Sequence, residues 1–149
     1  MGCGRGFLGR WLDAAGIGVR YAGVDRVEVA LESARQHVRN GMMTLGDFRA
    51  TDWQPEFDVV TAIEIAIDGS VGESIFDAAA AALRTGGMFA LTLASLHGQN
   101  AGRLGTLLKS AKQRFDYADL VDWTQRVTPF AHRTYGWWVI APWHPEIDE

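Results

Sequence analysis

Apolar and polar positions along the chain alternate with two different periods, and the longer period predicts four helices. From Phe7 onward, apolar side chains recur about once per helical turn until Gly16, a residue type that commonly ends a helix. Ser70 and Glu73 have the spacing of a capping box and are expected to begin a later helix. The predicted helices span residues 7–15, 27–38, 71–83 and 103–115.

The shorter period predicts strands between these helices. Residues 57–65 are nearly all apolar or β-branched, which is typical of a central strand covered on both faces. The last two strands are joined by the short loop 128–133, which favours an antiparallel pair. The predicted strands span residues 21–25, 42–45, 57–65, 88–93, 120–127 and 134–141.

Alternating helices and strands predict an α/β fold with a doubly wound, Rossmann-like sheet. The 149 residues are the length of a single domain, which we expect to span residues 1–149. Ligands of such sheets bind beyond the carboxyl ends of the strands. The residues to examine are therefore 2–6, Asp25, Asp47 and 63–68.

Composition narrows the classes of function. The formal net charge of −4 argues against a general nucleic-acid binder, because such proteins present a basic face to the phosphates. No apolar run reaches the roughly 18 residues of a membrane-spanning helix. Cys3 has no partner for an internal disulfide, as is usual in the reducing cytoplasm, so we expect a cytoplasmic protein.

A glycine-rich turn begins almost at the first residue and leads into the first helix. Gly2, Gly4 and Gly6 permit tight backbone angles and leave room for a ligand against the main chain. The helix that follows carries partial positive charge at its N-terminus. Such a turn normally follows a buried strand, and only Met1 precedes it here. We therefore expect the first strand of the sheet to be missing from the chain.

Two acids at strand ends complete a pattern suited to adenosine. Asp25 follows Gly6 with 18 residues between them, and its carboxylate can accept hydrogen bonds from both ribose hydroxyls. Asp47 ends the next strand and can accept a hydrogen bond from an adenine amino group. Phe48 beside it can cover the purine ring.

With these motifs the chain resembles the class I S-adenosylmethionine-dependent methyltransferases from Gly2 to about Leu93. The resemblance implies S-adenosyl-L-methionine as cofactor and an antiparallel pair of strands at the end of the sheet. In the family, an acid usually stands two residues before the first glycine, a position that would lie upstream of Met1. The matching segments are Gly2–Gly6, Tyr21–Asp25, Gly46–Phe48, Phe57–Val60 and Leu83–Gly87. The cofactor-binding residues that we predict are Gly2, Cys3, Gly4, Gly6, Asp25, Arg26, Asp47, Phe48, Ile63 and Glu64.

The segment 61–68 is expected to face the methyl acceptor. It lacks the Asn/Asp-Pro-Pro-Tyr motif of enzymes that methylate the amino groups of bases. It also lacks the second acid and the histidine of the metal-binding run in small-RNA 3′-end methyltransferases, so we predict no metal site. Glu64 and Asp68 are the candidate bases for the acceptor proton. We expect a small-molecule acceptor methylated at O, N or C.

Two other interpretations of the sequence stay open. Residues 4–9 satisfy the G-x-G-x-x-G pattern of dinucleotide-binding domains, which would indicate an NAD(P)- or FAD-dependent oxidoreductase. That class has no particular need for an acid and an aromatic residue at positions 47 and 48. The third interpretation is a methyltransferase fragment without activity.

Overall fold

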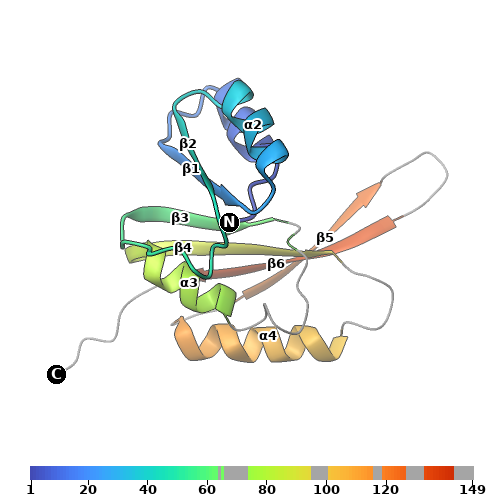
Figure 1. Cartoon of the computed structure of the whole chain (residues 1–149). Helices are drawn as coiled ribbons and strands as arrows, with labels where there is room; N and C mark the ends of the chain where they lie inside the picture. The colour runs from blue at the N-terminus through green and yellow to red at the C-terminus, as the bar shows by residue number, and fades with distance from the viewer. Residues whose placement is uncertain (64, 66–73, 95–100, 116–118, 127–132, 143–149) are drawn as a thin grey trace. The chain divides into compact units, whose positions relative to one another are not determined.

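The computed structural model describes residues 1–63, 65, 74–94, 101–115, 119–126 and 133–142 (Figure 1). The chain forms two compact units, Met1–Asp52 and Trp53–Glu149, and each is described by itself below. Both contain helices and strands, so the predicted α/β class is confirmed. None of the helices within the described ranges is long and apolar enough to cross a lipid bilayer.

The first unit is a two-stranded parallel sheet with two helices. β1 and β2 pair in register from Tyr21 opposite Gly41 to Asp25 opposite Leu45. Both strands therefore end at the same edge, which places Asp25 and the segment after Leu45 together. The elements of this unit are α1 (Phe7–Ala14), β1 (Tyr21–Asp25), α2 (Glu28–His37) and β2 (Gly41–Leu45).

The core of the first unit forms between α2 and the sheet. Leu31 and Ala34, three residues apart on one face of α2, are fully buried, and Val38 just beyond the helix is also buried. Val24 of β1 is 1% exposed, so α2 packs where the sequence pattern predicts an apolar face.

Helix α1 approaches the end of α2 through a glycine. A β-carbon on Gly9 would lie 2.8 Å from Cγ1 of Val38, so only glycine permits this close packing. The aromatic side chains of Phe7 and Trp11, which share the predicted apolar face, are exposed instead. The helix thus packs through its small residue rather than through its large ones.

The second unit is a four-stranded mixed sheet in the order β3-β4-β6-β5. β3 and β4 are parallel, whereas β6 runs antiparallel to both of its neighbours. Helices α3 and α4 lie on the same face of this sheet (Figure 1). The elements of this unit are β3 (Phe57–Ala62), α3 (Ser74–Ala82), β4 (Leu83–Ala94), α4 (Ala101–Arg114), β5 (Asp119–Arg126) and β6 (Arg133–Pro142).

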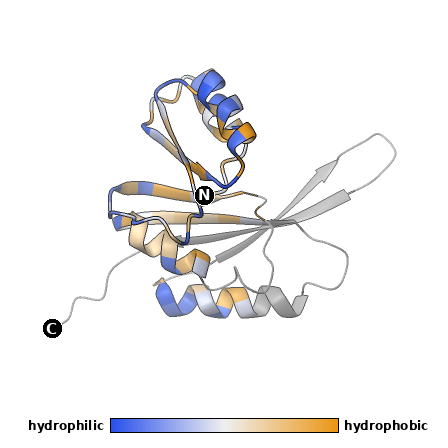
Figure 2. Cartoon of the chain, viewed as in Figure 1, coloured by the Kyte–Doolittle hydropathy of each residue, from blue (hydrophilic) through white to orange (hydrophobic). Residues whose placement is uncertain are grey.

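Three phenylalanines join β4 to the two helices. The ring centroids of Phe76 and Phe89 are 5.7 Å apart in an edge-to-face arrangement, and those of Phe89 and Phe115 are 6.0 Å apart and stacked. Helix α3 is apolar over most of its length (Figure 2), and its buried residues are Ile75, Phe76, Ala78, Ala79 and Ala82. On the other face of the strands, Val59 is 51% exposed, so none of the helices that the structure describes in this unit covers that position.

The element boundaries differ from the predicted ones where strand pairing decides them. α3 ends at Ala82, one residue before the predicted end, because Leu83 already pairs with Phe57 of β3. β4 therefore begins at Leu83 rather than at the predicted residue 88. Gly86 has a φ of 78° and lies within β4, beside an irregularity in the register. β3 ends at Ala62, earlier than the predicted end at residue 65.

Candidate functional site

The glycine turn adopts the backbone conformation for which its glycines were singled out. Gly2, Gly4 and Gly6 have φ values of 60°, 52° and 72°, in the left-handed region that other residues avoid. The amide of Gly6 donates to the carbonyl of Cys3 at 2.9 Å and closes the turn at the start of α1. A β-carbon on Gly4 would meet nothing within 4 Å, so the outer side of the turn is open to a ligand.

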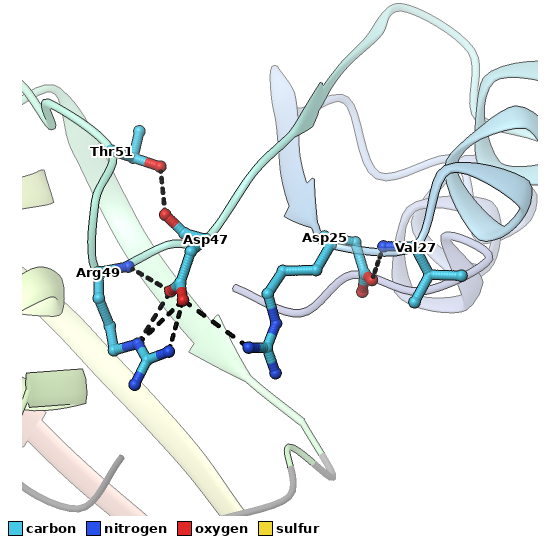
Figure 3. Close-up of polar contacts among 6 residues, drawn as sticks. Asp25, Val27, Asp47, Arg49 and Thr51 are labelled. Carbon is cyan, nitrogen blue, oxygen red and sulfur yellow. Dashed lines mark hydrogen bonds and ion pairs between the residues drawn. The ribbon is translucent and has the colours of Figure 1, made fainter. Parts of the chain in front are cut away.

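Asp25 holds this turn against the end of β1. Its Oδ2 accepts a hydrogen bond from the amide of Gly4 at 2.7 Å. Its Oδ1 accepts one from the amide of Val27 at 3.0 Å (Figure 3). The sequence indicated Asp25 as a ribose acceptor and missed this second role as an anchor. Each carboxylate oxygen has a further lone pair, so the anchored side chain can still accept from a ligand.

Backbone hydrogen bonds join the turn, β1 and β2 into one edge. The amide of Cys3 donates to the carbonyl of Val24 at 3.0 Å, and the amide of Gly46 donates to the carbonyl of Asp25 at 2.9 Å. The structure therefore brings together the glycine turn, Asp25 and Asp47, as predicted from the rule that ligands bind beyond strand ends.

Asp47 is held by Arg49, which was not among the predicted site residues. Arg49 donates its backbone amide to Oδ1 at 3.0 Å, its Nε to Oδ1 at 2.9 Å and its Nη2 to Oδ2 at 2.5 Å (Figure 3). These hydrogen bonds, with a smaller contribution from Arg26 at 3.8 Å, hold the pKa of Asp47 well below its usual range. The sequence signal that could have indicated this pair is the spacing of Asp47 and Arg49, an acid two residues before an arginine.

Phe48 is buried, with 9% of its surface exposed. The guanidinium carbon of Arg49 lies 6.0 Å from the centre of its ring, so the two side chains support each other. The role of Phe48 as a cover for a purine ring stays a prediction, and at this burial only an edge of the ring could take part.

The thiol of Cys3 is packed rather than presented for reaction. A β-carbon on Gly23 would lie 2.7 Å from its sulfur, which shows how closely the side chain covers β1. Burial raises the pKa of Cys3, and the negative charge of Asp25 raises it further. The thiolate is therefore disfavoured at neutral pH, which argues against a nucleophilic cysteine.

We expect Cys3 to react with a disulfide reagent such as DTNB at pH 7.5 at least about fivefold more slowly than glutathione, because only the thiolate reacts. The measurement is the rate of thionitrobenzoate release from the folded protein. The same chain unfolded in guanidinium chloride is the control and should react as an ordinary thiol. Equal rates in the folded and unfolded states would contradict the packed position.

The remaining predicted residues lie after β3. Ile63 follows the strand and is partly exposed, whereas Glu64 and Asp68 lie outside the described residues. In the part of the chain that the structure describes, no group of three or more His, Cys, Asp or Glu side chains could hold a metal ion. The roles of Ile63, Glu64 and Asp68 stay predictions.

Comparison with known proteins identifies a family model that covers this region. The model, described as a methyltransferase domain, matches residues 1–87, more than half of the 149 residues. The matched span contains the glycine turn, both acids and Arg49. No curated protein matches the chain significantly.

Solved structures share the fold at low sequence identity. The N-methyltransferase NodS from Bradyrhizobium japonicum WM9 is 15% identical with a TM-score of 0.74, and the match covers 97% of this chain and 83% of that one. A SAM-dependent methyltransferase from Methanosarcina mazei is 15% identical with a TM-score of 0.71, covering 97% and 91% of the two chains. A TehB-like SAM-dependent methyltransferase from Corynebacterium glutamicum is 18% identical with a TM-score of 0.68, covering 95% and 77%.

Proposed function

The chain belongs to the methyltransferase-domain family, and from this premise we propose that it transfers a methyl group from S-adenosyl-L-methionine to a small-molecule acceptor at O, N or C. One observation carries the proposal. A left-handed glycine turn with an open outer side is hydrogen-bonded to one strand-end acid, Asp25, and lies on the same sheet edge as a second acid, Asp47.

The residues present fit this cofactor. The open side of Gly4 allows a ligand to touch the main chain. The unused lone pairs of Asp25 suit the two ribose hydroxyls, and the ionised Asp47 suits the amino group of adenine. Arg26, Gly2, Cys3 and Gly6 shape the rest of the turn and its edge. When bound, the cofactor supplies an activated methyl group on a sulfonium sulfur.

The chain's own residues would align the acceptor and manage its proton. Methyl transfer is an in-line displacement, so the acceptor atom must be held opposite the leaving sulfur. We propose Glu64 or Asp68 as the base where the acceptor carries a proton. The formal net charge of −4 supports a small acceptor rather than a nucleic acid.

We also propose that residues 1–149 form a single domain with a doubly wound, methyltransferase-type sheet. Its support is the family match, which runs without a break from residue 1 to residue 87 and so extends from the first compact unit into the second. The single cysteine supports activity in the reducing cytoplasm.

The deciding experiment is calorimetric titration of the protein with S-adenosyl-L-homocysteine, the demethylated cofactor, and separately with NAD⁺. Binding of the thioether alone is the expected result. Binding of NAD⁺ alone would overturn the proposal in favour of an oxidoreductase domain. Binding of neither ligand would favour a fragment without activity.

We expect Asp25→Ala to weaken S-adenosyl-L-homocysteine binding by about 1–3 kcal/mol, because hydrogen bonds to a charged acceptor are lost. The substitution also releases the amides of Gly4 and Val27, so the turn is less well ordered. Glu32→Ala, which removes an exposed acid from α2, is the matched control and should bind as the wild type does. Unchanged affinity of the Asp25 variant would remove this residue from the site.

A further inference from the structure

The contact between Arg49 and Asp47 is a two-pronged pair that fixes the carboxylate in one orientation. Nε and Nη2 of the guanidinium reach different oxygens of Asp47, at 2.9 Å and 2.5 Å (Figure 3). Nε also lies 3.1 Å from the second oxygen. Such planar pairs constrain the angle of both groups as well as their distance.

The contacts also limit how Asp47 can accept another hydrogen bond. A carboxylate has about four lone-pair positions, and the guanidinium fork together with the backbone amide of Arg49 uses most of them. The lone-pair position that remains on Asp47 is directed away from Arg49. Asp47 therefore behaves as an acceptor with one preferred direction.

The acceptor that Arg49 orients is an ionised carboxylate. Asp47 is ionised at neutral pH, as aspartates ordinarily are, and Arg49 lowers its pKa further; an ionised carboxylate accepts hydrogen bonds but donates none. An amino group in the remaining direction would be bound, whereas a carbonyl oxygen would meet a negative charge with no proton between them.

We propose that Arg49 is a positioning residue that makes the cofactor site select a purine with an amino group, rather than a carbonyl group, at position 6. This inference rests on the proposed function, in which Asp47 faces the adenine of the cofactor. It assigns the choice of base to a residue that acts through Asp47 rather than by touching the purine.

Arg26 is less suited to this role than Arg49. Its guanidinium lies 3.8 Å from Oδ2 of Asp47, and 71% of its side chain is exposed. The side chain of Arg49 is 30% exposed and is further held over the buried ring of Phe48. Arg26 thus contributes charge, whereas Arg49 contributes charge and direction.

The test compares two ligands in each variant by calorimetry at pH 7. The ligands are S-adenosyl-L-homocysteine and S-inosyl-L-homocysteine, in which a carbonyl replaces the 6-amino group. We expect the wild type to prefer the adenosyl ligand by at least about tenfold. In Arg49→Ala the preference should fall below about threefold, chiefly through loss of adenosyl affinity. Arg49→Lys, which keeps the charge without the fork, should be intermediate.

The ratio of the two affinities separates positioning from general damage, because a merely structural role would weaken both ligands alike. Arg35→Ala is the matched control: it removes an exposed arginine that pairs with Glu28 at 2.7 Å in the same unit, and should leave the ratio unchanged. Arg26→Ala removes charge without removing the fork. Because Arg26 belongs to the proposed cofactor site, this variant should weaken both ligands alike and so preserve the ratio. If Arg49→Ala does not fold, as judged by circular dichroism, the Lys variant decides.

Failure of this inference is distinguishable from failure of the proposed function. If the wild type binds neither ligand, the proposed function and the inference both fall. If the wild type prefers the adenosyl ligand and the Arg49 variants keep that preference, only the inference is overturned. A loss of preference in Arg26→Ala equal to that in Arg49→Ala would also overturn it, because charge rather than direction would then be responsible.

Discussion

Gly6→Ala should lower the free energy of unfolding by about 2–5 kcal/mol and reduce S-adenosyl-L-homocysteine affinity by at least about tenfold. The left-handed backbone at Gly6, with a φ of 72°, costs about 1–2 kcal/mol for any residue with a β-carbon. That carbon would also lie 2.7 Å from Cγ2 of Val38 and 3.0 Å from Cβ of Ala34, and overpacking adds roughly 1–3 kcal/mol. Urea denaturation and calorimetric titration measure the two effects.

Gly16→Ala is the matched control for the backbone strain. Gly16 has a φ of 69°, but a β-carbon there would meet nothing within 4 Å, and the residue lies beyond the end of α1. This variant should lose only about 1–2 kcal/mol of stability and bind the cofactor analogue normally. Equal losses in the two variants would show that the clash with Val38 and Ala34 is not real.

Phe89→Ala should lower the free energy of unfolding by about 3–5 kcal/mol, the usual cost of removing a buried aromatic ring from a core. Phe89 is fully buried, and its ring contacts those of both Phe76 and Phe115. The substitution removes the ring contacts that β4 makes with Phe76 of α3 and with Phe115 at the end of α4. Thermal or urea unfolding followed by circular dichroism gives the value.

Met88→Ala is the control for the same strand. Met88 precedes Phe89, points to the opposite face and is 40% exposed, so its truncation should cost well under half as much. If both variants unfolded at the same denaturant concentration, the assignment of the two faces of β4 would be wrong.

Much of the first unit could be predicted from local pattern. The spacing of apolar residues over 27–38 indicated one buried helical face, and the structure buries Leu31, Ala34 and Val38 but leaves Val27 57% exposed. The predicted end of β1 rested on Asp25, and that of β2 rested on the Gly46-Asp47 pair that follows it. The pattern placed Phe7 and Trp11 on the apolar face of α1, but it could not show that Gly9 would make the close contact, because that depends on where α2 ends.

The candidate site was predictable in its residue types and less so in its contacts. The position of Asp25 at the end of a parallel strand next to the glycine turn was expected, whereas its bond to Gly4 spans 21 residues of sequence and needs the folded backbone. The pairing of Asp47 with Arg49 is local, yet spacing alone does not distinguish it from two solvated charges. Strand pairing also moved the start of β4 from the predicted residue 88 to Leu83, because Leu83 pairs with Phe57 of β3.

Two of the bonds that assemble the strand-end edge join main-chain atoms only. The amides of Cys3 and Gly46 donate to the carbonyls of Val24 and Asp25, and none of these four atoms belongs to a side chain. Substitutions accumulated over evolutionary time can therefore replace most surrounding residues without moving the two acids. This gives a physical reason why proteins only 15–18% identical to this chain can share its fold.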